Sequence, residues 1–504
     1  MTPVNRRVFE EICLILAALF AIFWAILRAC VQAITLDEAD TYFWFVARPV
    51  GYVFHPFSNN HVLNTLLMWM TTHAFGTSIL TVRAPALAGA ILYVSICYFL
   101  CRSITNDFHL RLPLFICLIY NPFILDFMVA ARGYGLANAF LLAAIAIPVW
   151  HRVKGRPTLH TSCALASLAL GLSFAANFSF AFVDLAAFLA ILIWAIRRRE
   201  GQSVVRAIGY CALPGMFVAL LLCGYPLAHW PKGAFWQSAQ SLKEMRQSLM
   251  QSSLYRLNPR FLDADLYDLM DFLRPRLPPL LVILCLCQLM ATRLDGSWFV
   301  DERTRWLGRF GAALAAITAF SVLLHWLAFR FHDVPLPLGR TGIFLIPLCT
   351  LVAGVIAAAP ARSVVSQWLS RGITGVFICL AFYFLLCLRL TYFKEYQWDA
   401  DVKDVYSVLA RLNHTYGVTD VATNGFYTGP LNFYRVLSKR ETFPEFTAIN
   451  GDPPCGKSVY VLPESYYQPF IKKANLVLVY RGKSTDVVVA VQPDGAIPGA
   501  EPPH

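Results

Sequence analysis

Apolar runs long enough to cross a lipid bilayer recur along the first 390 of the 504 residues, and they constrain the fold more than any other feature. A membrane-spanning helix needs about 20 predominantly apolar residues. Only 14% of the residues are charged, whereas soluble domains carry about 25%. The sequence therefore predicts a polytopic α-helical membrane protein with about eleven transmembrane helices. The runs cover residues 12–34, 81–102, 111–128, 134–151, 158–176, 178–196, 205–229, 277–292, 309–329, 341–359 and 371–390.

The distribution of basic residues predicts the orientation of these helices. The net charge of +12 resides in residues 1–390, because residues 391–504 are nearly neutral. Arginines and lysines concentrate in alternate gaps between the apolar runs, and such basic loops stay in the cytoplasm. We therefore expect a cytoplasmic N-terminus and an extracytoplasmic C-terminus. The expected partner is the lipid bilayer, and no nucleic-acid partner is expected.

The chain divides by composition into two expected domains. Residues 1–390 form a transmembrane domain with outer loops at 35–80 and 230–276. Residues 391–504 form a small extracytoplasmic α/β domain, because helix-like stretches alternate there with short β-branched runs. Cys455 is the only cysteine of that domain, so no disulfide is expected in it. A compact chain of this kind favours the bacterial inner membrane. The helix-like stretches are 401–416, 428–438 and 464–474, and the strand-like runs are 418–423, 458–462, 476–480 and 486–491.

Three carboxylates directly follow the first apolar run, in the stretch Thr35-Leu36-Asp37-Glu38-Ala39-Asp40-Thr41. Ionisable groups at a membrane boundary are costly unless they are hydrated or functional. If the stretch is helical, Asp37 and Asp40 share one face, and Glu38 points about 100° away. One acid can then enter a cavity while another caps or braces the helix. The alternative is that the acids only cap a helix N-terminus.

Further polar residues are expected at the outer ends of membrane helices, on the same side as Asp37. Arg132 and Arg340 lie beside glycines, where a ligand can approach the backbone closely. Arginine binds phosphate through two parallel hydrogen bonds. The alternative is that each arginine only reaches to lipid headgroups. The expected cluster comprises Asn60, His61, Asp126, Arg132, Tyr134, His332 and Arg340.

The order of several short motifs carries a family resemblance. The motifs are Asp37-Glu38, Asn59-Asn60-His61, Arg83-Ala84-Pro85, Asn121-Pro122-Phe123, Ala131-Arg132-Gly133-Tyr134 and Gly339-Arg340-Thr341. An acidic pair just after the first transmembrane helix, followed by these motifs, resembles the GT-C superfamily of integral-membrane glycosyltransferases. The likeness is closest to the dolichyl-phosphate-mannose protein mannosyltransferase and aminoarabinose lipid A transferase families.

The resemblance implies an activity and a set of roles. Such enzymes transfer a sugar, with inversion, from a polyprenyl-phosphate carrier to an acceptor hydroxyl on the extracytoplasmic face. The acceptor is a lipid, a glycan or a protein. Asp37 matches the general base, and Glu38 matches a supporting acid. Arg340 or Arg132 would stabilise the departing lipid phosphate. Substrate contacts are expected from Asp40, Asn60, His61, Asp126, Tyr134 and His332.

Metal dependence stays open at this point. Many relatives carry an acid immediately before the Ala-Arg pair, but this chain has Ala130 there, and Asp126 is the nearest acid. A divalent metal ion, if one is used, is therefore expected at Asp37 and Asp126. A site without metal is the alternative, and no other cofactor is implied.

Three other functions compete with a glycosyltransferase. A transporter or flippase for polyprenyl-linked saccharides would favour an internal repeat with Gly/Pro-broken helices at mid-membrane, and the sequence shows no repeat. A lipid-linked saccharide polymerase or ligase uses the same carrier, and no residue distinguishes it. A structural or receptor role predicts that the outer-loop acids can be replaced without effect.

Overall fold

A computed structural model of the chain describes residues 3–155, 157–198, 203–231, 238–258, 264–439, 443–449, 451, 453–454 and 456–493. Cys455 and the tail beyond residue 493 lie outside the described residues. By compactness the chain divides into two units. The first comprises Met1–Ile26, Val53–Leu67 and Ala84–Leu388, and the second comprises Leu27–Tyr52, Met68–Arg83 and Arg389–His504.

The protein is a polytopic helical membrane protein, as the sequence predicts. Ten helices in the described part of the chain are long and apolar enough to cross a membrane. On one of them, Leu213, Phe217 and Leu221 are each more than 60% exposed at a four-residue spacing. Such a stripe suits contact with hydrocarbon rather than water. The ten are α1 (Pro3–Val31), α4 (Ile79–Ile104), α7 (Tyr134–Lys154), α8 (Leu159–Ala176), α9 (Ala181–Arg198) with η3 (Phe178–Phe180), α10 (Val204–Ala228), α13 (Leu277–Leu294), α14 (Glu302–His332), α15 (Leu345–Ala357) with η5 (Gly339–Gly342), and α16 (Val364–Leu386).

The apolar run at 111–128 forms two shorter helices in place of one long helix. These are α5 (Phe108–Ile119) and α6 (Pro122–Phe127). The break falls at Asn121, whose side chain accepts hydrogen bonds from Phe123 N (3.0 Å) and Ile124 N (3.4 Å) and so caps α6. A residue before proline avoids the helical conformation, which ends α5 at this point. The expected number of about eleven long helices thus becomes ten.

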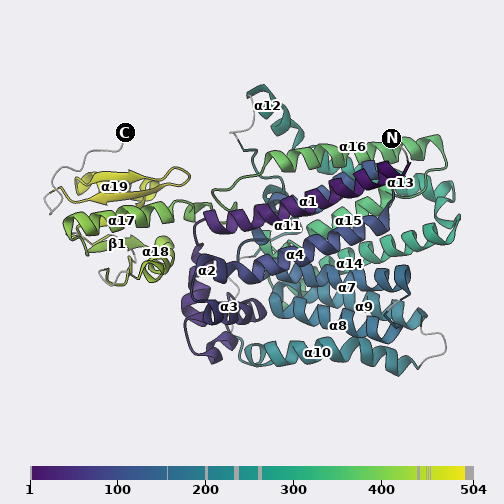
Figure 1. Ribbon diagram of the computed structural model, residues 1–504, viewed down its shortest axis with the longest axis horizontal. Helices are drawn as coiled ribbons and strands as arrows, with labels where there is room; N and C mark the ends of the chain where they lie inside the picture. Colours follow the sequence, from purple (N-terminus) through teal and green to yellow (C-terminus); the bar gives the residue numbers. More distant parts are fainter. Residues whose placement is uncertain are drawn as a thin grey trace. The chain divides into compact units, whose positions relative to one another are not determined.

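Close helix packing in the first unit depends on small residues. Helices α7, α8 and α10 run side by side (Figure 1). A Cβ atom added to Gly171 of α8 would lie 2.4 Å from the Gly215 carbonyl oxygen of α10. Gly215 N also donates to Ser167 Oγ at 2.9 Å. Small residues that let two backbones approach are the usual basis of helix association in membranes.

The second unit contains the small α/β fold that the C-terminal sequence predicts. Its five-stranded sheet has the order β2-β1-β3-β5-β4. Strands β2, β1 and β3 are parallel, and β5 runs antiparallel to both β3 and β4. The elements are α17 (Val402–Tyr416), β1 (Val421–Asn424), α18 (Gly425–Ser438), β2 (Ala448–Ile449), β3 (Val459–Pro463), α19 (Glu464–Lys473), β4 (Val477–Arg481) and β5 (Val487–Val491).

Helices cover both faces of this sheet. Tyr467 and Ile471 of α19 pack into a core with Tyr460 of β3 and Ala490 of β5. Helices α17 and α18 contact β5 and β1, and Figure 1 shows the helices of this domain close to the strands. Four successive residues of β3, Val459 to Leu462, are fully buried, as expected for a strand enclosed on both faces.

Other short elements complete the chain. The first predicted outer loop contains α2 (Leu36–Thr41), the π-helix η1 (Tyr42–Val46), η2 (Val50–Phe54) and α3 (Val62–Phe75). The second predicted outer loop contains α11 (Leu242–Ser253) and α12 (Ala264–Leu273). The turns η4 (Ser297–Phe299) and η6 (Gln397–Asp399) lie elsewhere. Most of the first loop belongs to the second unit, together with the sheet.

Candidate functional site

The three acids lie on the short helix α2, which begins at a well-defined cap. Thr35 Oγ1 accepts a hydrogen bond from Glu38 N (3.2 Å), and Glu38 Oε2 accepts one from Thr35 N (3.0 Å). This reciprocal capping box fixes the first turn of the helix. As expected for a helix, Asp37 and Asp40 share one face and are partly exposed, whereas Glu38 is buried.

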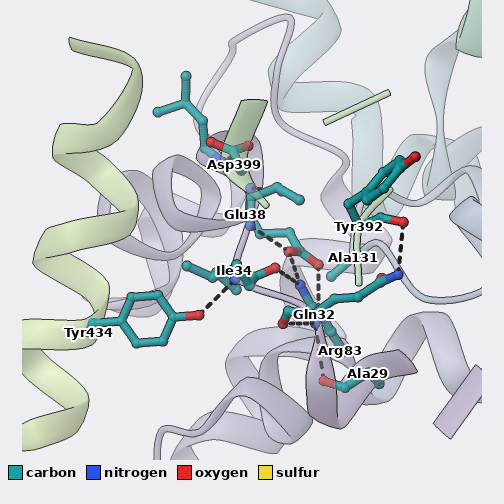
Figure 2. A network of polar contacts seen from close by, with 12 residues as sticks. Ala29, Gln32, Ile34, Glu38, Arg83, Ala131, Tyr392, Asp399 and Tyr434 are labelled. Carbon is teal, nitrogen blue, oxygen red and sulfur yellow. Dashed lines mark hydrogen bonds and ion pairs between the residues drawn. The ribbon is translucent and has the colours of Figure 1, made fainter. Parts of the chain in front are cut away.

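Glu38 forms an ion pair with Arg83 in the interior of the second unit (Figure 2). Arg83 Nε lies 3.0 Å from Glu38 Oε1, and Arg83 Nη2 lies 2.8 Å from Glu38 Oε2. Both side chains are fully buried. Two parallel charge-assisted hydrogen bonds fix orientation as well as distance. Glu38 is therefore the acid that braces α2, and its charge is paired with that of Arg83.

The same arginine also holds the end of the first membrane helix. Arg83 Nη1 donates to the carbonyl oxygens of Ala29 (3.1 Å) and Gln32 (3.0 Å), and Nη2 donates to that of Ala33 (2.6 Å). Carbonyls at a helix C-terminus lack partners within the helix, and a cation complements the dipole there. The guanidinium carbon lies 5.2 Å from the centre of the Phe393 ring. Arg83 thus connects the end of α1 to the start of α2.

A segment near the start of the C-terminal region contacts α2 from a second side. Tyr396 Oη donates to Asp37 Oδ2 at 2.7 Å. Leu36 N donates to Asp399 Oδ2 at 2.9 Å. Asp399 is the last residue of η6, and Tyr396 directly precedes this turn, so both lie within one stretch of four residues. The first acid of the pair and the first backbone N–H of its helix are therefore both held by residues about 360 positions later in the sequence.

Two further contacts fix the chain just before α2. Ile34 N donates to Tyr434 Oη of α18 at 3.1 Å (Figure 2). Gln32 Nε2 donates to the Tyr392 carbonyl oxygen at 3.0 Å. Tyr434 is buried, and burial raises the pKa of its phenol to about 12. The phenol therefore stays neutral over the physiological range and keeps its role as an acceptor for the backbone N–H.

Asp399 has an unusual environment for a carboxyl group. The side chain is 1% exposed, and its Oδ1 atom has no hydrogen-bond partner among the described residues. Burial raises the pKa of Asp399 well above its ordinary value, and the charges of Asp37, Glu38 and Asp40 raise it further. The hydrogen bond from Leu36 N opposes this shift but does not reverse it. Burial therefore favours the protonated form of this carboxyl group.

Residues of the first unit form a second group of predicted contacts. Arg132, 1% exposed, donates to the Asn59 carbonyl oxygen at 3.2 Å and to its side-chain oxygen. The His61 and Tyr134 rings meet edge to face at 5.4 Å. Asn60 Nδ2 donates to the carbonyls of residues 53 and 55, both at 2.9 Å. The segments 59–61 and 132–134, both predicted to contribute to the site, therefore lie together. Asn60 stabilises the loop that directly precedes it, through the backbone carbonyls of residues 53 and 55.

Gly133 allows the segment 132–134 to approach the backbone at Ala176 closely. Its φ is +73°, and an added Cβ atom would lie 2.1 Å from the Ala176 carbonyl oxygen. Asn177, the next residue, donates from Nδ2 to the Arg132 carbonyl oxygen at 3.5 Å. Asn177 also caps η3, and η3 contacts η5. A glycine is required here both by the backbone conformation and by the space.

The remaining predicted residues of the first unit lie in separate elements. Arg340 is half-buried in η5, a turn held to α11 by a hydrogen bond from Gly339 N to Ser248 Oγ at 2.9 Å. Asp126 is buried in α6. His332 is exposed at the C-terminal end of α14. The structure thus brings Asn60, His61, Arg132 and Tyr134 together.

A metal site is not apparent in the part of the chain that the structure describes. Among those residues, no group of three or more His, Cys, Asp or Glu side chains is placed to hold an ion. Asp37 has Tyr396 as a hydrogen-bond partner, and Asp126 is buried in a different unit of the chain.

Sequence reasoning assigned no role in the site to four residues that surround α2: Arg83, named only as part of a motif, and Tyr396, Asp399 and Tyr434. Arg83 carried a signal, because a cation at the start of an apolar run requires a partner when it is buried. The other three lie in the C-terminal region, and no local pattern links them to the first loop. Their contacts depend on how the chain returns to α2.

Comparison with known proteins gives a fold but no close relative. No protein-family model matches the sequence, and no curated protein matches it either. Among solved structures, apo ArnT from Cupriavidus metallidurans aligns with a TM-score of 0.50 and 10% identity over 97% of this chain and 98% of ArnT. ArnT bound to undecaprenyl phosphate aligns with a TM-score of 0.49 and 10% identity over 98% and 99% of the two chains. ArnT is an aminoarabinose lipid A transferase of the GT-C superfamily, and the chain shares its fold from end to end, as the motif order predicted.

Proposed function

We propose that the protein is a glycosyltransferase of the GT-C type. It transfers a sugar from a polyprenyl-phosphate-linked donor to an acceptor hydroxyl on the extracytoplasmic face of the membrane. The shared fold, the acidic pair after the first membrane helix and the order of the motifs support this proposal.

The observation that carries the proposal is the different environment of two adjacent acids. Glu38 is fully buried and paired with Arg83. Asp37 is partly exposed on a neighbouring face of the same turn, and the Tyr396 phenol donates to it at 2.7 Å. Neighbouring carboxyl groups whose environments differ in this way take different roles in catalysis. Asp37 is therefore the acid available for chemistry, and Glu38 supports it.

The proposed reaction is a single in-line displacement. The Asp37 carboxylate removes the proton of the acceptor hydroxyl as that oxygen attacks the anomeric carbon. The bond between this carbon and the phosphate oxygen breaks, and polyprenyl phosphate leaves with the bonding electron pair. The configuration at the anomeric carbon is inverted, and the proton remains on Asp37 until it passes to solvent. No step of this proposal runs through a metal ion.

The departing phosphate requires a cation in a poorly hydrated place. Arg340 is the better candidate of the two arginines, because it is half-buried in a turn that contains glycines. Arg132 is almost fully buried and is therefore less accessible to a lipid phosphate. We therefore assign the phosphate to Arg340 and a supporting contact to Arg132. Asn60, His61, Tyr134, Asp126 and His332 remain proposed substrate contacts.

The proposal also includes a topology. Residues 1–390 would form the transmembrane transferase domain of a bacterial inner-membrane protein, with a cytoplasmic N-terminus. Residues 391–504 would form an extracytoplasmic domain. Reporter fusions test this: alkaline phosphatase joined after residue 493 should be active, and a fluorescent protein at the same place should not fluoresce. The opposite result would reverse the orientation.

The activity is tested with purified protein in lipid nanodiscs. The protein and its Asp37→Asn variant are each mixed with a panel of polyprenyl-phosphate sugars and a cell-envelope extract as acceptor. Release of free polyprenyl phosphate is followed over time. Asp404→Asn is the matched control, because Asp404 is an exposed acid of the second unit, on α17, whose Oδ2 lies 3.8 Å from Lys483 Nζ.

Turnover by the parent and the control, with a loss of about a hundredfold or more in Asp37→Asn, would support the donor class and the base. Equal turnover by Asp37→Asn would remove Asp37 from that role. If no donor is turned over while sugar lipids cross the membrane of reconstituted vesicles, the protein is a transporter and the proposal is wrong.

A further inference from the structure

A cavity of about 340 Å³ lies in the second unit, between α2 with η1 on one side and α18 on the other. Asp40 and Trp44 contribute from the first side, one and two helical turns after the proposed base. Thr428 and Gly429 contribute from α18, and Glu445 and Phe446 from the segment after it. Every wall of this cavity therefore belongs to one compact unit.

The cavity exists because one face of α18 carries only small side chains. Gly425, Thr428, Gly429 and Asn432 follow one another at helical spacing and all line it. A Cβ atom added to Gly429 would lie 3.1 Å from Asp40 Oδ1, so this glycine lets the carboxylate approach the helix backbone. A larger residue at these positions would fill the space.

The side-chain amide of Asn432 holds the far wall in place. Asn432 Oδ1 accepts from Phe446 N at 2.9 Å, and Asn432 Nδ2 donates to the Phe446 carbonyl oxygen at 2.8 Å. Both residues are buried. The Asn432 amide thus pairs with both backbone polar groups of Phe446, as a neighbouring strand would. This wall of the cavity is therefore already formed before a ligand binds. A preformed site loses less entropy when a ligand binds.

The lining defines the chemistry of the ligand. The charged side chains among the lining residues, Asp40 and Glu445, are both acids, so they repel anions and accept hydrogen bonds from hydroxyl groups. Trp44 is 41% exposed and offers a flat apolar face. The volume is at the lower end of the range for small-molecule sites, about 300–1,000 Å³. It suits a single ring with many hydroxyl groups.

We propose that this cavity is a saccharide subsite that takes an uncharged pyranose ring and rejects a ring that carries a carboxylate or phosphate. The subsite deepens the proposed function, since a ring held against Asp40 lies beside the helix that carries the Asp37 base. It would hold the acceptor. The binding step itself is independent of turnover and is measured without a donor.

The test uses the full-length protein in nanodiscs and saturation-transfer NMR. The probes are the methyl pyranosides of glucose, mannose, galactose and N-acetylglucosamine, together with methyl glucuronide. Methyl glucuronide matches methyl glucoside except for its carboxylate. At least one neutral glycoside should bind, and methyl glucuronide should bind at least about tenfold more weakly than the glucoside, because like charges face it.

Variants locate the binding. Trp44→Leu should weaken binding about tenfold, and Trp44→Phe, which keeps a ring, should weaken it less. Asp40→Asn combined with Glu445→Gln should admit methyl glucuronide while the neutral glycoside still binds. The control is Tyr466→Leu on α19, which removes an aromatic ring that is 76% exposed elsewhere in the same unit, and it should leave binding unchanged.

Each outcome separates the two proposals. No binding of any neutral glycoside, or equal binding of the glucuronide and the glucoside, overturns the subsite. Glycoside binding that is lost equally in Tyr466→Leu and Trp44→Leu also overturns it. If a neutral glycoside binds but no donor is turned over, the subsite proposal stands and the proposed transferase activity is wrong. If a donor is turned over but no glycoside binds, only the subsite proposal is wrong.

Discussion

The Tyr396 phenol donates a hydrogen bond to the Asp37 carboxylate across 2.7 Å, although the two residues are 359 positions apart in the sequence. Tyr396 is almost fully buried, so its hydroxyl group is fixed in direction. A residue of the C-terminal region thus orients the proposed base. A hydrogen bond to an ionised carboxylate stabilises the charged form and makes the group a weaker base.

This contact predicts a change in the pH profile when the phenol is removed. Tyr396→Phe keeps the ring but not the donor, so protonation of the proposed base becomes easier. The acid limb of kcat/KM should therefore move to higher pH, by up to about one unit. The pH dependence of donor turnover measures this shift. Tyr466→Phe, at an exposed tyrosine of the same unit, should leave the limb in place; if both profiles are unchanged, Tyr396 does not act on the base.

The buried pair of Glu38 and Arg83 predicts a large loss of stability in one variant and partial recovery in another. Arg83→Met leaves Glu38 as an uncompensated buried charge, which should cost about 3–5 kcal/mol. Adding Glu38→Gln removes that charge and keeps an acceptor for the capping box, so part of the loss should return. The four proteins of the cycle are the parent, Arg83→Met, Glu38→Gln and the double variant, and their unfolding midpoints in detergent give the coupling energy. Additive effects would mean that the two side chains do not interact.

The buried carboxyl group of Asp399 should make the free energy of unfolding fall as the pH rises. Burial raises its pKa, so between about pH 4 and the raised pKa the folded state binds a proton that the unfolded state releases. Over that window the free energy of unfolding should fall by up to about 1.4 kcal/mol per pH unit. Asp399→Asn keeps an oxygen acceptor for Leu36 N but has no titration, so its unfolding midpoint should vary less with pH.

The control for this experiment is Asp404→Asn, which should keep the parent's dependence on pH. An Asp399→Asn protein whose midpoint falls with pH as steeply as the parent's would show that another group is responsible.

Gly133 predicts an effect that exceeds the usual cost of a left-handed residue. Gly155→Ala, at φ +63° with nothing within 4 Å of the new Cβ atom, should lose only about 1–2 kcal/mol. Gly133→Ala has the same conformational cost and also places a methyl group 2.1 Å from the Ala176 carbonyl oxygen. It should fold poorly or not at all, as measured by the yield of monodisperse protein. Equal yields for the two variants would contradict the close approach.

The sequence predicted the elements well where local pattern determines them. Apolar runs located the ten long helices, and alternating β-branched runs located β1, β3, β4 and β5. The pattern failed at Asn121, where a cap and a proline interrupt an otherwise continuous run, and at β2, which is only two residues long. Hydropathy averages over such short features, so it cannot detect them.

The site was predicted only in its local part. The acidic motif and its helix follow from adjacent residues, and the capping box of Thr35 and Glu38 fits that pattern. Arg83, Tyr396 and Asp399 contact this helix from 45, 359 and 363 residues away. Such pairs depend on the path of the chain, and no periodicity in the sequence encodes them. For that reason Glu38 and Asp37 could be named, but their division of roles could not be derived.

The discontinuous make-up of the second unit has a consequence for biosynthesis. Helix α2 leaves the ribosome 359 residues before Tyr396 does, which is roughly 20 to 70 seconds at about 5–20 residues per second. During that interval α2 lacks two of its contacts, the hydrogen bond from Tyr396 to Asp37 and the hydrogen bond from Leu36 N to Asp399. A nascent or truncated chain could then hold Glu38 against Arg83 but would leave Asp37 without its phenol donor, so the proposed activity should begin only when translation is nearly complete.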